Sequence, residues 1–188
     1  QEVFGNDKPV WLELGCGKGG FAAQAVVHWQ DVNFIAVDIK NEMLVLAKRK
    51  IEQALTEHKL TAEQVRVMIF NISHIEEAFG ENDPIERIFI NFCNPWPKKK
   101  HHKRRLMQRP RTDLLASKLI GGGYLYFVTD WEEYAQSALA ELGATDGLSN
   151  RYDGFAPHQE WRPRTQFEQK GLDADRVIRE LFFVKDEE

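Results

Sequence analysis

Apolar runs typical of β-strands alternate with segments of helical periodicity along most of the chain. The run at 34–38, for example, precedes a segment at 41–58 in which apolar residues recur at spacings of three and four. Strands that alternate with helices in this way form parallel sheets, because each helix carries the chain back to the start of the next strand. The sequence therefore predicts an α/β fold with a doubly wound, mostly parallel sheet.

The apolar runs and the periodic segments give the expected element boundaries. Strands are expected at Val10–Leu14, 34–38, 65–70, 87–91, 124–129 and 176–185. Helices are expected at about 19–29, 41–58, 75–79, 110–120 and 131–141. The glycines at 121–123 are expected to break the chain before the fifth strand. The polar stretch at 145–175 is expected to hold a sixth strand and an ordered loop.

The size and composition of the chain fit a single domain. A chain of 188 residues can bury one good core, so we expect one domain over 1–188. The opening "QEVFGNDKPVW" lacks a methionine, and we expect an N-terminal arm to be missing. No apolar run approaches the length of a membrane span, so no membrane partner is expected. Cys16 and Cys93 are too few for a disulfide framework, which favours a reducing, cytoplasmic location.

Polar residues stand at or just after the ends of the five expected parallel strands. They are Glu13, Asp38, Asn71, Asn94 and Asp130. Each of them alone could be a helix cap or a turn residue. In open α/β sheets, however, ligands bind beyond the carboxyl ends of the strands. Together these residues would line one edge with carboxylates and amides, which suits a ligand with positive charge and hydroxyl groups.

The first loop at this edge, "ELGCGKGG", fits two cofactor-binding patterns. Gly15, Gly17 and Gly20 fit the G-x-G-x-x-G of dinucleotide-binding proteins, whereas Gly15, Gly17 and Gly19 fit the E-x-G-x-G-x-G of S-adenosylmethionine-dependent methyltransferases. Both patterns need glycine where the backbone turns tightly against a ligand. Glu13 would repel a pyrophosphate but favours a sulfonium or an ammonium group, so S-adenosylmethionine is the expected cofactor.

Two of the strand-end residues have further candidate roles. Asp38 lies about 20 residues beyond the loop and suits the hydroxyl groups of a ribose, although it could also cap the next helix. Asn71 could bond the edge of an adenine or form an Asn-capped turn.

The segment "NFCNPWPKKKHHKRRL" at 91–106 sets a rigid Pro-Trp-Pro turn before a basic run. Eight Lys or Arg residues and no acid lie at 98–111, although the whole chain has a net charge of −4. Such a local patch is typical of a surface that binds nucleic acid. His101 and His102 have neither a cysteine nor a spaced third histidine nearby, so no metal is expected.

The motifs "ELGCGKG", "NFCNPWPKKKHHKRRL", "TDW" and "RPRTQFEQKG" together resemble those of the bacterial tRNA (guanine-N7-)-methyltransferases. The resemblance runs from about Val3 to the C-terminus. It implies a Rossmann-like class I methyltransferase fold, in which a seven-stranded sheet has an antiparallel C-terminal strand. It also implies methyl transfer from S-adenosylmethionine to guanine N7 in tRNA, in the variable loop.

The resemblance assigns roles to residues that match the family's motifs. It places Glu13, Gly15, Gly17, Gly19, Asp38, Asn71 and Asn94 at the cofactor, with Asn94 at the catalytic position. It places tRNA contacts at Lys98, Lys100, His101, His102, Lys103, Arg104, Arg105, Asp130, Thr165, Gln166, Phe167 and Glu168.

The chain departs from the family at Asn71 and Asn94, where aspartate is commoner. Guanine N7 carries a lone pair and no proton, so its methylation needs no general base. Alignment of N7 with the methyl group is the main task. We therefore expect Asn94 to orient the guanine, by accepting a hydrogen bond from N1 or N2 or donating one to O6.

Several candidate contacts have a structural alternative. Trp96 could stack on a base or plug the space between two prolines. Asp130 could read the N1 and N2 groups of guanine or cap the next helix. Thr165 and Glu168 fit a capping box as well as a substrate contact. Arg162 could meet a phosphate.

Three other functions remain open from the sequence. "NPWP" faintly resembles the Asn-Pro-Pro-aromatic signature of exocyclic-amine methyltransferases, although its order differs. G-x-G-x-x-G permits a nicotinamide-dependent oxidoreductase. The two asparagines permit a non-catalytic RNA-binding protein. A monomer and a homodimer are equally compatible with the sequence.

Overall fold

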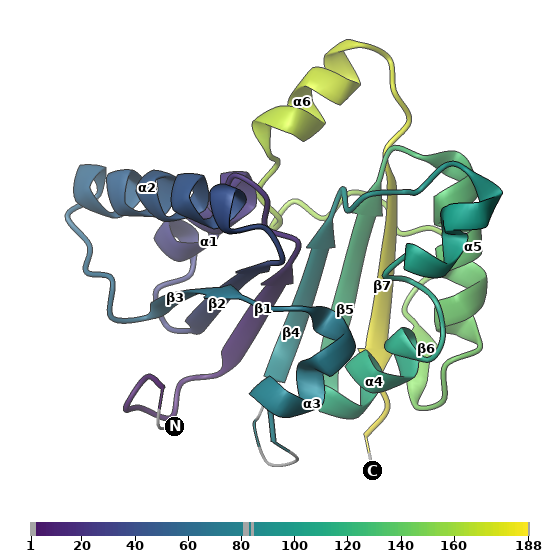
Figure 1. The fold of residues 1–188 in the computed structure, drawn as a ribbon, viewed down its shortest axis with the longest axis horizontal. Helices are drawn as coiled ribbons and strands as arrows, with labels where there is room; N and C mark the ends of the chain where they lie inside the picture. The colour runs from purple at the N-terminus through teal and green to yellow at the C-terminus, as the bar shows by residue number, and fades with distance from the viewer. Residues whose placement is uncertain (1–2, 81–82, 84, 188) are drawn as a thin grey trace.

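The computed structural model describes residues 3–80, 83 and 85–187. Its centre is a seven-stranded sheet with the strand order β3-β2-β1-β4-β5-β7-β6 (Figure 1). The strands are β1 (Val10–Leu14), β2 (Asn33–Asp38), β3 (Val65–Ile69), β4 (Ile85–Asn91), β5 (Leu119–Thr129), β6 (Leu148–Asn150) and β7 (Arg179–Lys185). Strands β1 to β5 are parallel, whereas β7 runs antiparallel between β5 and β6. The predicted α/β fold with an antiparallel C-terminal strand is confirmed.

Helices cover both faces of the sheet (Figure 1). They are α1 (Gly20–His28), α2 (Asn41–Glu57), α3 (Ile75–Ala78), α4 (Arg111–Lys118), α5 (Glu132–Gly143) and α6 (Gln166–Asp173), with 3-10 turns η1 (Ile72–His74) and η2 (Lys99–Arg104). Alternate strand residues point to opposite faces. Phe34 and Phe89 therefore pack with α1 and α2, while Ile35 and Ile88 pack with α3, α4 and α5.

Most strand boundaries lie within two residues of the prediction, and two differ by more. Strand β5 begins at Leu119 and includes the three glycines, because the chain bulges there: Ile85 pairs with Leu119, and Arg87 pairs next with Tyr124. A side chain at Gly123 would lie 2.6 Å from the carbonyl oxygen of Glu86, so the close approach needs glycine. Strand β7 begins at Arg179 rather than at 176.

The parallel strands bring their carboxyl ends to one edge of the sheet, which lies on the side of α6 in Figure 1. Glu13 and Asp38 stand at the ends of β1 and β2, and Asn71, Asn94 and Asp130 follow β3, β4 and β5. The polar edge expected from the sequence is therefore present. Within the described residues, no helix combines the length and the apolar character needed to span a membrane.

Candidate active site

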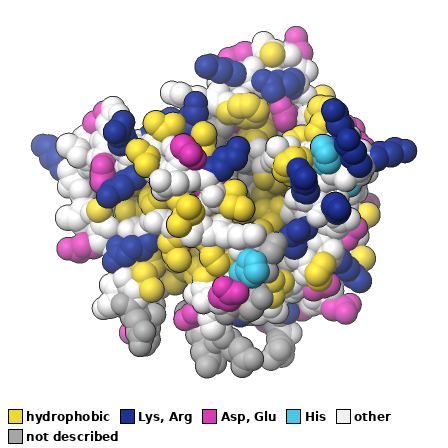
Figure 2. Space-filling view, viewed as in Figure 1, with side chains coloured by type: hydrophobic (Ala, Val, Ile, Leu, Met, Phe, Trp, Pro, Cys, Tyr) yellow, Lys and Arg dark blue, Asp and Glu magenta, His cyan; other side chains and the backbone are white. Residues whose placement is uncertain are grey.

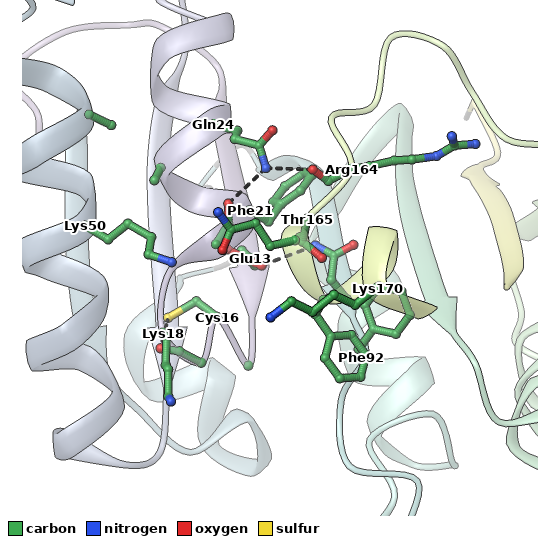
Figure 3. Close-up of a pocket in the computed structure, with 18 of the residues that line it drawn as sticks. Glu13, Cys16, Lys18, Phe21, Gln24, Lys50, Phe92, Arg164, Thr165 and Lys170 are labelled. Carbon is green, nitrogen blue, oxygen red and sulfur yellow. Dashed lines mark hydrogen bonds between the residues drawn. The ribbon is translucent and has the colours of Figure 1, made fainter. Parts of the chain in front are cut away.

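A cavity of about 960 Å³ opens at this edge (Figure 3). The loop after β1, helices α1 and α2, the end of β4 and the start of α6 form its walls. The lining includes Glu13, Gly15, Gly17, Lys18, Gln24, Lys50, Gln53, Asn91, Phe92, Arg164, Thr165, Gln166, Phe167 and Lys170. Gln24 of α1 donates a hydrogen bond of 2.8 Å to the carbonyl oxygen of Arg164, which fastens the segment before α6 across the cavity.

The glycines of the first loop have two different roles. Gly15 and Gly17 have φ angles of 78° and 52°, and a side chain built on either would enter open space. These positions therefore leave room for a ligand against bare backbone. Gly19, with a φ of 74°, is different, because a Cβ there would lie 2.7 Å from the Cα of Ala47. Glycine at position 19 therefore allows the loop to pack closely on α2, and its contact with the cofactor remains a prediction.

Glu13 and Asn91 form a buried polar pair at the cavity. Their exposed fractions are 2% and 8%, and Asn91 Nδ2 donates to Glu13 Oε1 at 3.2 Å. Neither Glu13 Oε2 nor Asn91 Oδ1 has a hydrogen-bond partner among the described residues. Burial raises the pKa of Glu13 to about 8, against a smaller lowering by the bond from Asn91. Two buried acceptors without donors suit a ligand with cationic N–H groups.

Asn91 was missed by the sequence reasoning, although a signal was present. An asparagine that ends the apolar run "IFIN" is itself a polar residue at a strand end. The motif match assigns the role of polar residue at the end of this strand to Asn94, three residues later.

Asp38 shapes the glycine loop. Its Oδ2 accepts a hydrogen bond of 2.9 Å from Gly17 N, and its Oδ1 accepts one of 2.9 Å from Lys40 N at the start of α2. Asn71 is exposed, and its carbonyl oxygen accepts a bond from His74 N in the turn η1. Asp38, Asn71 and Asn94 share the edge with Glu13 but do not line the 960 Å³ cavity. Their contacts with the cofactor remain predictions.

The turn after β4 has an unusual backbone that its own side chains stabilise. Phe92 and Trp96 have φ angles of 52° and 46°, which non-glycine residues rarely adopt. Asn94 Oδ1 accepts a hydrogen bond of 3.0 Å from Trp96 N. The guanidinium of Arg104 lies 4.9 Å from the centre of the Trp96 ring, and the His101 ring lies 5.8 Å from it. The segment thus holds an exposed asparagine beside a half-buried tryptophan.

The basic run continues from this turn and faces solvent. Its exposed cations are Lys98, Lys99, Lys100, Lys103 and Arg104. His101 and His102 are half-buried between them. In Figure 2, Lys and Arg side chains gather at the upper right, on the side of the molecule where α5 lies in Figure 1. Because the run follows β4, it starts from the same edge of the sheet as the Glu13–Asn91 pair.

Arg105 differs from its neighbours, and the expected phosphate contact needs correction. Its side chain is only 2% exposed. It donates to Pro95 O at 2.8 Å and to both carboxylate oxygens of Glu133, at 3.0 and 2.5 Å. Arg105 therefore fastens the Pro-Trp-Pro turn to α5.

The segment before α6 also combines exposed and buried residues. Thr165 caps α6, because its Oγ1 accepts a hydrogen bond of 3.0 Å from Glu168 N. Gln166 and Phe167 are exposed at the cavity, and the Phe167 ring lies 5.0 Å from that of Phe92. Glu168 is 1% exposed, so the expected substrate contact through its side chain is not available in this structure.

Glu168 instead belongs to a buried cluster centred on Arg162. Arg162 donates to Glu168 at 2.9 and 2.6 Å and to Glu180 of β7 at 3.2 and 3.0 Å. His158 lies 2.9 Å from Glu180, and Tyr126 donates to the same carboxylate. The expectation that Arg162 meets a phosphate is wrong, since its side chain is fully buried.

The acidic cluster could be mistaken for a metal centre. His158, Glu168 and Glu180 place ligand atoms within 4.8 Å of one another. The guanidinium of Arg162 already supplies the cation between the two carboxylates. Burial lowers the pKa of Arg162, but its bonds with Glu168 and Glu180 raise it overall, so the positive charge is fixed.

Asp130 has an unexpected partner. Its Oδ2 bonds to Arg176 Nη1 at 2.5 Å, and no side chain caps α5, whose N-cap is Trp131. The predicted helix cap at Asp130 is therefore wrong. A contact of Asp130 with guanine remains a prediction.

Comparisons with known proteins show which family the chain resembles. The chain matches the family described as "Putative methyltransferase" over residues 7–181. The tRNA (guanine-N(7)-)-methyltransferase of Clostridium beijerinckii is 40% identical over 189 residues, which cover 99% of this chain and 86% of that protein. The protein of the same name from Bordetella pertussis is 35% identical over 183 residues, covering 97% and 70%.

Solved structures resemble the fold at low sequence identity. The 16S rRNA methyltransferase KamB superposes with a TM-score of 0.68 at 10% identity, covering 98% of this chain and 91% of that one. The plantazolicin methyltransferase BamL, solved with S-adenosylhomocysteine, gives 0.59 at 13% identity, covering 98% and 79%. The fold is therefore the Rossmann-like fold of the class I methyltransferases.

The sequence matches then identify the family. The chain belongs to the tRNA (guanine-N(7)-)-methyltransferase family. This membership removes the nicotinamide-dependent oxidoreductase from the alternatives.

Proposed function

We propose that this protein transfers the methyl group of S-adenosylmethionine to N7 of a guanine in tRNA, at a position in the variable loop. The main support for the proposal is that two contrasting surfaces lie at one edge of the sheet. A cavity with buried, unpaired acceptors lies at this edge, and the exposed cations at 98–104 extend from it. The first surface suits a cationic cofactor, and the second suits the phosphates of RNA.

The residues present fit S-adenosylmethionine. The orphaned oxygens of Glu13 and Asn91 can accept from its ammonium group, and the bare backbone at Gly15 and Gly17 leaves room for it. Asp38 and Asn71 would hold the ribose and the adenine at the neighbouring strand ends. The cofactor supplies an electrophilic methyl carbon on a positively charged sulfur.

The target guanine needs orientation rather than proton removal. N7 uses its own lone pair, so the site must hold the base against the methyl group. Asn94 Oδ1 already accepts from Trp96 N, which favours its amide nitrogen as a donor to guanine O6. Trp96 would stack on a base next to this contact. The exposed cations of the basic run would hold the flanking phosphates.

Methyl transfer to unmodified tRNA tests the function directly. The protein is incubated with labelled S-adenosylmethionine and tRNA, and the nucleosides are separated after digestion. The expected product is 7-methylguanosine. A methylated exocyclic amine would contradict the assignment to N7, and cofactor binding without any product would favour a non-catalytic RNA-binding protein. The variant Asn94→Asp in the same assay reports whether a carboxylate speeds the reaction.

The location and assembly of the enzyme follow the same proposal. We place it in the cytoplasm, where tRNA is modified, as a monomer or a homodimer that needs no metal. Gel filtration with and without tRNA measures the assembly.

A further inference from the structure

We propose that Glu13 and Asn91 act as one proton-linked receptor for the ammonium group of the cofactor, and that Glu13 releases a proton when the cofactor binds. The inference rests on the proposed use of S-adenosylmethionine. It assigns a binding role to Asn91 and a coupling between cofactor binding and pH.

Two oxygen atoms of the buried pair have no hydrogen-bond donor among the described residues. Glu13 Oε2 and Asn91 Oδ1 are both buried without a donor, although the two side chains are already joined by the bond from Asn91 Nδ2 to Glu13 Oε1. A buried acceptor without a donor destabilises the protein, and more so if it is charged. A proton on Oε2 removes the charge of Glu13 and turns one orphan into a donor. The protein without its cofactor therefore favours the neutral carboxyl group.

The surroundings of Glu13 support the same conclusion. Burial raises its pKa to about 8, although the hydrogen bonds from Asn91 and from the backbone of Ala22 lower it, and the charge of Asp38 adds a smaller increase. Other titratable or charged side chains line the cavity from the first loop, α2 and the segment that leads into α6: Cys16 and Lys18 in the loop, Lys50 and Glu57 on α2, Arg164 before α6, and Lys170 on α6. The lining residues of α1 and of the end of β4 include no titratable side chain. Of these, Lys18, Lys50, Arg164 and Lys170 are exposed, so solvent screens their charges at the buried pair.

The ligand must bring both charge and N–H donors. A sulfonium group has no N–H or O–H donor, and a ribose hydroxyl has no charge. An ammonium group has both, and it can donate to Glu13 Oε2 and Asn91 Oδ1 together. Its positive charge then favours the ionised carboxylate, so the proton of Glu13 leaves to solvent.

Calorimetry of the wild-type protein tests this coupling without methyl transfer. S-adenosylhomocysteine is titrated at pH 7 in phosphate and in Tris, whose different ionisation enthalpies report the protons released. Close to one proton is expected at pH 7, and the number should fall as the pH rises through 8, because more of Glu13 is then already ionised while the ligand still carries its ammonium group. The matched control ligand is 5′-methylthioadenosine, which keeps the adenosine but lacks the ammonium group. It should bind without proton release.

Two variants locate the effect. Glu13→Gln should abolish proton release, and Asn91→Leu should weaken S-adenosylhomocysteine roughly 10- to 100-fold, as expected for a lost bond to a charged donor, without weakening 5′-methylthioadenosine. Thermal unfolding of each variant checks that it is folded. Equal proton release with both ligands, or none with either, would overturn the inference. If the inference fails in this way, formation of 7-methylguanosine would still establish the proposed function. Conversely, proton release with S-adenosylhomocysteine but no 7-methylguanosine would support the inference and contradict the proposed function.

Discussion

Buried carboxyl groups occur in two regions of this protein and are treated differently. At the cavity, the donors near Glu13 are neutral, namely the side chain of Asn91 and the backbone amide of Ala22, and its Oε2 has no hydrogen-bond partner within bonding distance among the described residues. In the cluster below α6, Glu168 and Glu180 share the guanidinium of Arg162, with further bonds from Tyr126 and His158. The second region contains its own cation, whereas no Lys or Arg among the described residues bonds to Glu13.

The difference distinguishes a site that can bind a ligand from a cluster that stabilises the fold. A buried carboxylate is stable only with a countercharge and enough donors. The chain supplies both to Glu168 and Glu180, and so joins α6 to β7. The described part of the chain supplies Glu13 with no bonded countercharge and too few hydrogen-bond donors, which leaves a place for a cationic ligand. The predictions below are ordered by their expected effect on the free energy of unfolding.

Removing the cation of the cluster should have the largest effect. Arg162→Met leaves Glu168 and Glu180 buried without their countercharge, and should lower the free energy of unfolding by about 3–5 kcal/mol. Urea denaturation at pH 7 measures it. The control is Arg164→Met, two residues away, whose side chain is 42% exposed and should contribute at most about 1 kcal/mol. Similar losses in both variants would show that the cluster is not a unit.

Replacing the carboxyl group at the cavity should have the opposite sign. Burial raises the pKa of Glu13 from 4.5 to about 8, so the folded protein favours the protonated form. The contribution of the protonated Glu13 to the free energy of unfolding is fully present below pH 4.5 and is lost as the pH rises toward 8. Glu13→Gln should therefore gain stability relative to wild type as the pH rises, by roughly 2–3 kcal/mol at pH 7. Urea denaturation from pH 5 to pH 8 checks this dependence, and a constant difference would contradict it.

The sequence predicted what depends on local pattern. The parallel sheet follows from the alternation of strands and helices, and its topology places Glu13 and Asp38 at one edge. Burial of individual cations was not predictable, because it depends on distant partners. The buried side chain of Arg105 bonds to Glu133, which is 28 residues away in the sequence, and that of Arg162 bonds to Glu180, which is 18 residues away. In the sequence, both arginines resemble their exposed neighbours.

Two adjacent arginines test this distinction within the basic run. Arg105→Ala removes the bonds to Pro95 O and Glu133, and should lower the free energy of unfolding by about 1–2 kcal/mol, since Glu133 can still be solvated. Arg104→Ala removes an exposed cation and its contact with Trp96, and should change it by less than about 1 kcal/mol. Thermal or urea unfolding measures both variants. A larger loss of unfolding free energy in Arg104→Ala than in Arg105→Ala would contradict the structural role of Arg105.

The smallest effect on unfolding is expected where the cations are fully exposed. Replacing Lys99, Lys100 and Lys103 together with alanine should change the free energy of unfolding by less than about 0.5 kcal/mol per residue, because no partner is left buried. The same variant should bind tRNA less tightly. If each lysine contacts one phosphate, the slope of log affinity against log salt should fall by roughly 2–3. Filter binding of tRNA between 50 and 300 mM salt measures this slope.

A matched variant separates this local contact from net charge. Lys40→Ala, Lys48→Ala and Arg49→Ala together remove the same charge from the exposed surface at α2, which lies across the sheet from α5 in Figure 1. Long-range attraction would weaken tRNA binding equally in both triple variants. Direct phosphate contact at the basic run would lower the salt slope in the first variant alone. An unchanged slope there would place the tRNA backbone elsewhere, and the exposed cations at 98–104 would then be a solvated surface next to the active site.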